Sequence, residues 1–350
     1  MKTAMTELGP ELPGAVADHG GSLGRVRARF PDAPEPWIDL STGINPHSYP
    51  HSAVAATAFT RLPEPADEER LRDAAALAYR APAAANVAAA PGTQILLPML
   101  YGLMKAGNAA VFSPTYAEHG RAAKLAGHRV VEVADLGALA DADLAIVVNP
   151  NNPDGRLHRR GELADVARRL ADRGGILVVD EAFMDVSEAD ASLCPLVDEI
   201  PVVVLRSFGK FYGLAGVRLG FAISSRHLAE RLVARLGPWA VSGPALSIGI
   251  AALRDDDWRA AMRRQLHTES RRLDDLIRKA ELSPCGGTDL FRFVRDPKAA
   301  EIHDALGRAG IAVRIFDALP GALRFGLPDN ETAWQRLEQA LSGWTRAREW

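Results

Sequence analysis

Short apolar runs alternate with helical stretches through the middle of the chain. The runs are rich in β-branched residues and end in polar, Gly or Pro residues: "NVAAA", "AAVFSP", "LAIVVNP", "GILVVDEAF", "VVVLRSF" and "VRLGFAIS". Stretches with helical periodicity, such as 161–172, lie between them. Strands that are apolar on both faces and alternate with helices are typical of a mostly parallel sheet covered on both sides. The pattern predicts a large α/β domain over residues 51–250.

A second, smaller unit is expected over residues 251–350. A long charged helical stretch at 255–280 leads to "LFRFV", "IAVRIF" and "ALRFGLP". A last helix places Trp334, Leu337, Leu341 and Trp344 on one face. This pattern predicts an α+β domain. Residues 1–50 show no comparable pattern, and the prolines of "PDAPEPW" oppose a helix or a central strand, so we expect an N-terminal arm there.

Charge and composition exclude several classes of function. Lys and Arg total 41 against 44 Asp and Glu, so the net charge of −3 provides no basic surface for nucleic acid or for a membrane. The longest apolar run, residues 95–104, is too short to span a bilayer, and acidic residues stand where a signal peptide would be apolar. Cys194 and Cys285 lack metal-ligand spacing. We therefore expect a cytoplasmic protein without a metal site that acts on a small molecule.

The residues at the end of the fifth apolar run, "VVVLRSF", and just after it carry the first candidate chemistry. In "SFGKFYGLAGVRLGF", Ser207 is followed by Lys210 and then by Arg218. A lysine just past a buried strand is desolvated, loses its proton readily and can form a Schiff base. A hydroxyl and a guanidinium beside it suit a phosphate. Alone, the three residues are not decisive, and a surface lysine with a structural arginine is the alternative interpretation.

Other strand ends add complementary groups. Asp180 closes "ILVVD" and needs a cationic partner, which a protonated pyridine nitrogen would provide. Asn152 in "NPNNPDG" has an amide that can donate to a ring oxygen. Tyr116 in "SPTY" offers a face for stacking. Ligands bind at the carboxyl ends of strands in open α/β sheets, so these groups are expected to meet.

A phosphate cup completes the set. "PGTQILLPML" places Gly92, Thr93 and Gln94 at a helix N-terminus, where free N–H groups bind anions. The lysine, the acid, the amide, the aromatic ring and the cup together predict pyridoxal 5'-phosphate as the cofactor.

These motifs, in this order over residues 86–221, resemble those of the aspartate-aminotransferase-like enzymes of fold type I, in the branch of the histidinol-phosphate aminotransferases. The resemblance implies that Lys210 and Asp180 are catalytic, binding the cofactor covalently and pairing with its ring nitrogen. It also implies a homodimer, and places Arg324 at the substrate carboxylate, although a salt-bridged structural arginine is the alternative. The other cofactor-binding residues implied are Gly92, Thr93, Gln94, Tyr116, Asn152, Ser207 and Arg218.

The arm distinguishes branches within this group. "DHGGSLGRV", followed by "WIDLSTGINPHSYP", resembles the signature of the threonine-phosphate decarboxylases of cobalamin biosynthesis. The resemblance implies decarboxylation of L-threonine O-3-phosphate to (R)-1-amino-2-propanol O-2-phosphate. The substrate-binding residues would be His19, Gly43, Asn45, Asn152 and Arg324. His19 as a surface residue and Asn45 as a turn cap are the alternatives from the residues themselves.

An aminotransferase of histidinol phosphate or a related amino acid is the alternative function. Phe183 stands where those enzymes usually have a tyrosine, and Leu62 stands where many have another. Both departures favour the decarboxylase. A binding protein that had lost the chemistry would be expected to lack Lys210 or Asp180, and both are present.

Overall fold

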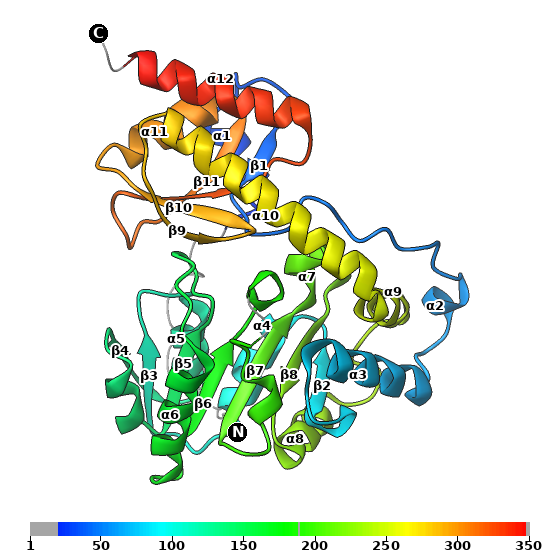
Figure 1. The fold of residues 1–350 in the computed structure, drawn as a ribbon. Helices are drawn as coiled ribbons and strands as arrows, with labels where there is room; N and C mark the ends of the chain where they lie inside the picture. Colours follow the sequence, from blue (N-terminus) through cyan, green and yellow to red (C-terminus); the bar gives the residue numbers. More distant parts are fainter. Residues whose placement is uncertain (1–19, 188–189, 348–350) are drawn as a thin grey trace, which may run out of the picture.

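A seven-stranded sheet forms the centre of the larger unit (Figure 1). The computed structural model describes residues 20–187 and 190–347. The strand order is β2-β8-β7-β6-β5-β3-β4, and all neighbours are parallel except at β8, which is antiparallel to β2 and β7. The strands are β2 (Val87–Ala90), β3 (Asn108–Phe112), β4 (Arg129–Val133), β5 (Leu144–Val148), β6 (Ile176–Asp180), β7 (Val202–Ser207) and β8 (Gly220–Ile223). The expected α/β architecture of fold type I is confirmed.

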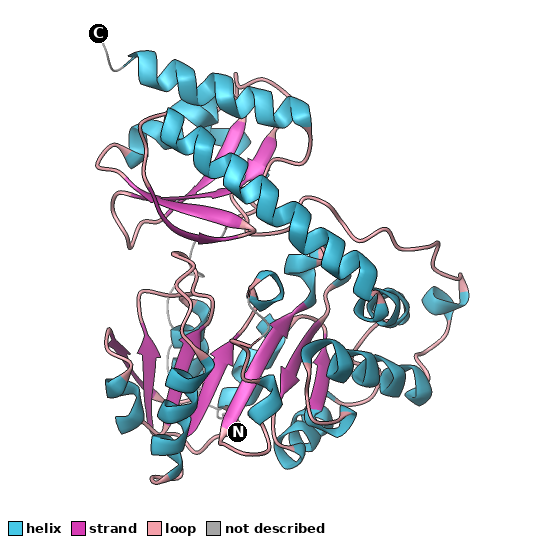
Figure 2. Cartoon of the chain, viewed as in Figure 1, coloured by secondary structure: helices cyan, strands magenta, loops and turns pink. Residues whose placement is uncertain are grey.

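Helices cover both faces of this sheet (Figure 2). The helices of the larger unit are α2 (Thr57–Thr60), α3 (Pro65–Tyr79), α4 (Thr93–Tyr101), α5 (Glu118–Leu125), α6 (Arg160–Ala171), α7 (Phe208–Phe211), α8 (Arg226–Leu236) and α9 (Gly243–Arg254), of which α3, α4, α5, α6 and α8 pack on the sheet. Five 3-10 helices join them, at η1 (Ala84–Asn86), η2 (Gly137–Asp141), η3 (Met184–Val186), η4 (Cys194–Leu196) and η5 (Ala215–Val217). Val178 packs with α4, α5 and α8, whereas Val179 packs with α3 and α6, because successive strand residues face opposite sides.

The smaller unit contains a five-stranded sheet of order β1-β11-β12-β10-β9. Its strands are β1 (Ile38–Leu40), β9 (Pro284–Thr288), β10 (Phe291–Arg295), β11 (Ile311–Ile315) and β12 (Ala322–Gly326). Its helices are α1 (Leu23–Arg29), α10 (Asp256–Lys279), α11 (Ala299–Arg308) and α12 (Glu331–Ala347). β1 comes from the N-terminal arm and pairs in parallel with β11, so the arm is part of this sheet.

Helix α10 runs between the two units (Figure 1). Its N-cap is Asp255, whose side chain accepts a hydrogen bond from the backbone N–H of Trp258, which satisfies one of the free donors at the helix start. The long charged helix expected at 255–280 is thereby confirmed. Among residues 20–187 and 190–347, no helix is both long and apolar enough to cross a bilayer.

Candidate active site

A cavity of about 830 Å³ lies at the carboxyl ends of β5, β6 and β7 and reaches β11 and β12 of the smaller unit. This is the place expected for a ligand in an open α/β sheet. Of the residues predicted from sequence, those that line it are Gly92, Thr93, Gln94, Tyr116, Asn152, Asp180, Ser207, Lys210, Arg218 and Arg324. The fold therefore gathers every predicted cofactor-binding residue around one cavity.

Lys210 stands on α7, a single helical turn that directly follows β7. Burial lowers the pKa of Lys210 to about 8, and the positive charges of Arg324 and Arg218 act in the same direction, against Asp180. An amine with this pKa is partly unprotonated near neutral pH. Lys210 is therefore suited to attack an aldehyde carbon and to exchange a proton afterwards.

Asp180, at the end of β6, accepts hydrogen bonds on both carboxylate oxygens. His119 Nε2 lies 2.9 Å from Oδ2, and the N–H of Ala182 donates to Oδ1 at 3.0 Å. The Tyr101 hydroxyl lies 2.7 Å from His119 Nδ1 and donates to it when Nε2 carries the ring proton. These contacts hold the carboxylate in place at the cavity, where it can face a pyridinium nitrogen. Sequence reasoning missed His119, because the local sequence "AEHGRAAK" contains no motif that singles out this histidine.

The phosphate cup is built around a glycine in a left-handed conformation. Gly92 is the N-cap of α4 with φ of 89°, and a Cβ atom there would lie 2.8 Å from Arg218 Nη2. The backbone therefore leaves the space that the guanidinium occupies beside the helix N-terminus. Ser207 and Thr93 line the same cavity. This combination fits the phosphate of pyridoxal phosphate.

Gln94 and Tyr116 hold each other at the wall of the cavity. The Tyr116 hydroxyl donates to Gln94 Oε1 at 3.1 Å, and Gln94 Nε2 donates to Glu118 Oε2 at 3.0 Å. Burial, with the charges of Glu118 and Asp180, raises the pKa of Tyr116 to about 12. The phenol is therefore neutral at physiological pH and keeps its ring in place. Because the Gln94 side chain is engaged, its backbone N–H is the group directed to the cup.

Arg324 joins the smaller unit to the larger one. Its Nη1 donates to Asn152 Oδ1 at 2.8 Å, and its Nη2 donates to the carbonyl of Ser41 at 3.0 Å. Burial lowers the pKa of Arg324 to about 10, and the charge of Arg314 acts in the same direction, against Asp39. These partners are neutral groups, as expected of an arginine that retains its charge for an anionic ligand.

Arg314 is a second cation that sequence reasoning missed. It is the direct cross-strand partner of Arg324, on β11 opposite β12, and it lines the same cavity. Like charges directly opposite each other destabilise a sheet. Two guanidinium groups line the wall of one cavity, on adjacent strands of the smaller unit. The signal was available in "IAVRIF" and "ALRFGLP", but only strand pairing shows that the two arginines are neighbours.

Two of the arm residues predicted to bind substrate lie away from the cavity wall. Gly43 and Asn45 are buried outside the lining of this cavity. A Cβ atom at Gly43 would lie 2.9 Å from a ring carbon of Phe183. The Asn45 amide donates to the carbonyl of Phe211, and its side-chain oxygen accepts from the N–H of His47, so both groups are engaged. Direct contact of Asn45 with a substrate stays a prediction, and in the structure its side chain is held by Phe211 and His47.

The arm still reaches the cavity through other residues. Gly20, Ser41 and Thr42 line it. His19, also predicted to bind substrate, lies outside the described residues. The start of "LSTGINPHSYP" thus forms one part of the cavity wall, and the rest of that run packs against α7.

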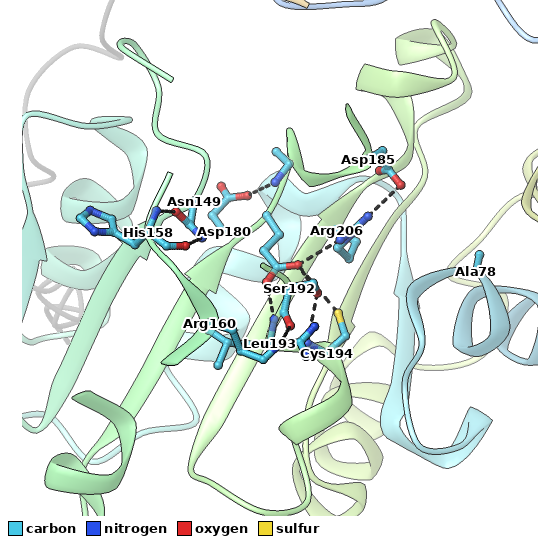
Figure 3. A network of polar contacts seen from close by, with 12 residues as sticks. Ala78, Asn149, His158, Arg160, Asp180, Asp185, Ser192, Leu193, Cys194 and Arg206 are labelled. Carbon is cyan, nitrogen blue, oxygen red and sulfur yellow. Dashed lines mark hydrogen bonds and ion pairs between the residues drawn. The ribbon is translucent and has the colours of Figure 1, made fainter. Parts of the chain in front are cut away.

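A buried ionic network lies on the opposite side of β6 and β7 (Figure 3). Arg206 Nη1 donates to Glu181 at 2.9 Å and Nη2 donates to Asp185 at 2.7 Å. Glu181 also accepts from the Ser192 hydroxyl and from the Leu193 N–H. Asp180 and Glu181 are adjacent in sequence, yet one carboxylate faces the cavity and the other is held in this network. The network thereby fixes the strand ends that carry Asp180 and Ser207.

Comparisons with known proteins identify the family of this chain. Residues 35–337 match the model of the family "Aminotransferase class I and II". A threonine-phosphate decarboxylase from Pseudomonas aeruginosa is 42% identical over 94% of this chain and 98% of its own length, and one from Sinorhizobium sp is 41% identical over 93% and 97%. The crystal structure of histidinol-phosphate aminotransferase from Sinorhizobium meliloti in complex with pyridoxal-5'-phosphate has a TM-score of 0.81 at 22% identity, over 99% of both chains. The chain belongs to the class I and II aminotransferase family.

Proposed function

We propose that this chain is a decarboxylase that converts L-threonine O-3-phosphate into (R)-1-amino-2-propanol O-2-phosphate and CO2 in cobalamin biosynthesis. The observation that carries the proposal is the pair Arg314 and Arg324, which face one cavity from adjacent strands. A substrate with a carboxylate and a phosphate presents one anionic group to each guanidinium. The two threonine-phosphate decarboxylases that are 41–42% identical over most of the chain support the same substrate.

Pyridoxal 5'-phosphate is the cofactor, and when bound it supplies an electron-withdrawing ring for the electrons of the breaking carbon–carboxylate bond. Arg218, Ser207 and the N-terminus of α4 hold its phosphate. Asp180, held by hydrogen bonds with His119 and Ala182, would pair with the ring nitrogen of the cofactor.

The substrate is oriented by groups of both units. Arg324 holds the carboxylate and Arg314 the phosphate, while Ser41 and Thr42 close the wall on the side of the arm. Asn152, bonded to Arg324, is placed to share its amide with the cofactor. Lys210 is the base and acid of the site, since its amine can return a proton to the α-carbon after CO2 has left.

The test is incubation of the purified protein with threonine phosphate, with and without 2-oxoglutarate. Release of CO2 and of the amino alcohol phosphate without an acceptor is expected, and Lys210→Ala should abolish it. Glutamate formed only when 2-oxoglutarate is present would instead identify an aminotransferase and overturn the proposal.

We also propose a homodimer in the cytoplasm. Phe59 and Leu62, on and beside α2, and Trp239, after α8, expose 68%, 64% and 53% of their surface, and large exposed apolar side chains favour burial against a second copy. Cys194 and Cys285 are both free thiols, as expected in a reducing compartment. Size-exclusion chromatography with light scattering measures the molar mass of the purified protein in solution. The mass of a single chain at micromolar concentration would contradict the dimer.

A further inference from the structure

The carbonyl groups at the end of α7 all accept hydrogen bonds from the arm. The N–H of Asn45 donates to the carbonyl of Lys210 at 2.9 Å, and its Nδ2 donates to that of Phe211 at 2.8 Å. The N–H of Tyr49 donates to the carbonyl of Tyr212 at 2.9 Å, and the Ser48 hydroxyl donates to that of Gly213 at 2.8 Å. Four consecutive carbonyls, from residue 210 to residue 213, are thus satisfied by residues 45–49.

This contact compensates for the shortness of α7. The helix has four residues, Phe208–Phe211, and an isolated turn of this length is unstable because nucleation of a helix is unfavourable. Carbonyls at a helix end have no partner within the helix and need one from elsewhere. The arm provides these partners from a segment more than 160 residues earlier in the chain. It acts as a C-terminal cap supplied from outside the helix.

Close packing leaves little freedom at this contact. Gly213 has φ of 65°, and a Cβ atom there would lie 2.7 Å from the carbonyl oxygen of Asn45. On α7 and just after it, the rings of Phe208 and Tyr212 stack at 4.3 Å, and Tyr212 stacks on Trp258 of α10 at 5.6 Å. The short helix is therefore held by the arm and by an aromatic stack.

The other end of the same arm segment contacts Arg324. The carbonyl of Ser41 accepts from Arg324 Nη2 at 3.0 Å, and β1, immediately before it, is paired with β11. A Cβ atom at Gly326, two residues beyond Arg324, would lie too close to the carbonyl of Thr42 to fit. Only three residues separate Ser41 from Asn45. One short segment therefore touches both Arg324 and the helix of Lys210.

We infer that residues 41–49 form a bridge that sets the position of Lys210 relative to Arg324, and that Asn45 is a positioning residue within it. The inference deepens the proposed function and rests on it for the kinetic measurement. In this role the arm does more than close the cavity: it fixes the distance between the amine that exchanges protons and the guanidinium that holds the carboxylate. Displacement of a reacting group by about 1 Å can lower a rate by about two orders of magnitude.

Two variants remove bridge contacts outside the cavity lining. Asn45→Asp loses the donor to Phe211 but keeps the acceptor for His47, so a role limited to the turn would survive it. Ser48→Ala loses the hydroxyl that donates to Gly213, adds no charge, and changes an exposed residue whose replacement does not threaten folding. Ser52→Ala, an exposed serine four residues further on, is the matched control.

The first measurement uses cofactor-free protein, so it does not depend on the reaction. Amide hydrogen exchange in peptides covering 207–214 should become about fivefold faster in Asn45→Asp and in Ser48→Ala, as expected for the loss of one hydrogen bond. Exchange in α8 should not change. The pH at which the Lys210 amine is half-labelled by an amine-reactive reagent should rise in both variants, because a loosened helix exposes the amine to water. Ser52→Ala should match the parent protein.

The second measurement separates positioning from substrate binding. With threonine phosphate, kcat should fall about tenfold in Asn45→Asp while KM stays unchanged. Unchanged exchange in both variants, a raised KM with unchanged kcat, or faster exchange with unchanged kcat would each overturn the inference. If the parent protein releases no CO2, the proposed function fails, whereas the exchange and labelling results still decide whether the bridge holds Lys210.

Discussion

His119 Nε2 lies 2.9 Å from Asp180 Oδ2, and both side chains are almost completely shielded from solvent. His119 Nδ1 is in turn bonded to the Tyr101 hydroxyl, so the ring has a partner on each side. A carboxylate buried at a strand end is costly unless its oxygens are bonded. The histidine thus provides one of the hydrogen bonds that hold the Asp180 carboxylate at the cavity.

His119→Ala should lower the free energy of unfolding at pH 7 by about 2 kcal/mol, because a hydrogen bond to a charged group is lost. It should also weaken retention of the cofactor. Urea denaturation and the cofactor content after dialysis measure the two effects. His227→Ala, at an exposed histidine of α8, should change neither. Equal stability of the two variants would show that His119 is not needed by Asp180.

Arg324→Met should raise the pKa of Lys210 above about 8. The positive charge of Arg324 disfavours the protonated amine, so its removal favours protonation. The pH dependence of Lys210 labelling in cofactor-free protein measures the shift. The same variant should lower kcat/KM for threonine phosphate by about 10- to 100-fold, because charge-assisted hydrogen bonds to the substrate are lost. Arg295→Met, at an exposed arginine on β10, should leave the labelling profile unchanged.

Gly92→Ala should weaken binding of the cofactor. The new Cβ would lie 2.8 Å from Arg218 Nη2, and φ of 89° would be strained by about 1–2 kcal/mol in a residue other than glycine. The dissociation constant for pyridoxal phosphate, measured by absorbance titration of cofactor-free protein, should therefore rise. Gly161→Ala is the control, since a Cβ atom there meets nothing within 4 Å. Unchanged affinity in Gly92→Ala would remove Arg218 from the phosphate cup.

Glu269→Gln should alter how stability depends on pH. His47 Nε2 lies 2.8 Å from Glu269, and this hydrogen bond raises the pKa of His47 above its usual 6.5. The stabilisation is complete below the pKa of an unfolded histidine and is lost as pH rises through the higher pKa of the folded state. The variant should therefore be less stable by up to about 1 kcal/mol near pH 6, with little difference near pH 9.

Urea denaturation at several pH values tests this dependence. Glu301→Gln, at an exposed glutamate of α11, serves as the control. Its effect on the free energy of unfolding should be small and the same at every pH. If the loss of stability in Glu269→Gln instead became larger as pH rises, the trend would be opposite to the expected one and would exclude His47 as its cause.

Most of the predicted cofactor residues, including Asp180 and Lys210, were found because they lie at or just after the end of an apolar strand. Both residues lie at the carboxyl end of a strand, which is where ligands bind in parallel sheets, and both line the cavity. The segments "LFRFV" and "ALRFGLP" were also sufficiently apolar to be recognised as strands, and they form β10 and β12.

Other elements carry too little local signal. β4 lies at the edge of its sheet and is largely exposed, so its valines do not form a buried apolar run. β9 has the sequence "PCGGT", which is poor in strand-forming residues and depends on pairing with β10. Helix α1 lies where an arm was expected. His119 contacts Asp180, and Arg314 pairs with Arg324 across two strands, and neither contact is visible from the local sequence. The turn expected at Asn45 is present, and the Asn45 side chain also caps α7.

The alternation along β6 limits which changes in length the chain can tolerate. Asp180 and Glu181 are neighbours with opposite tasks, one at the cavity and one bound to Arg206. Deletion of a single residue within the strand would rotate everything after it to the other side. The carboxylate beside the cofactor and the carboxylate beside Arg206 would both be displaced. An exchange between apolar side chains of similar volume in β6 preserves this alternation, whereas a change in the number of residues before Asp180 does not.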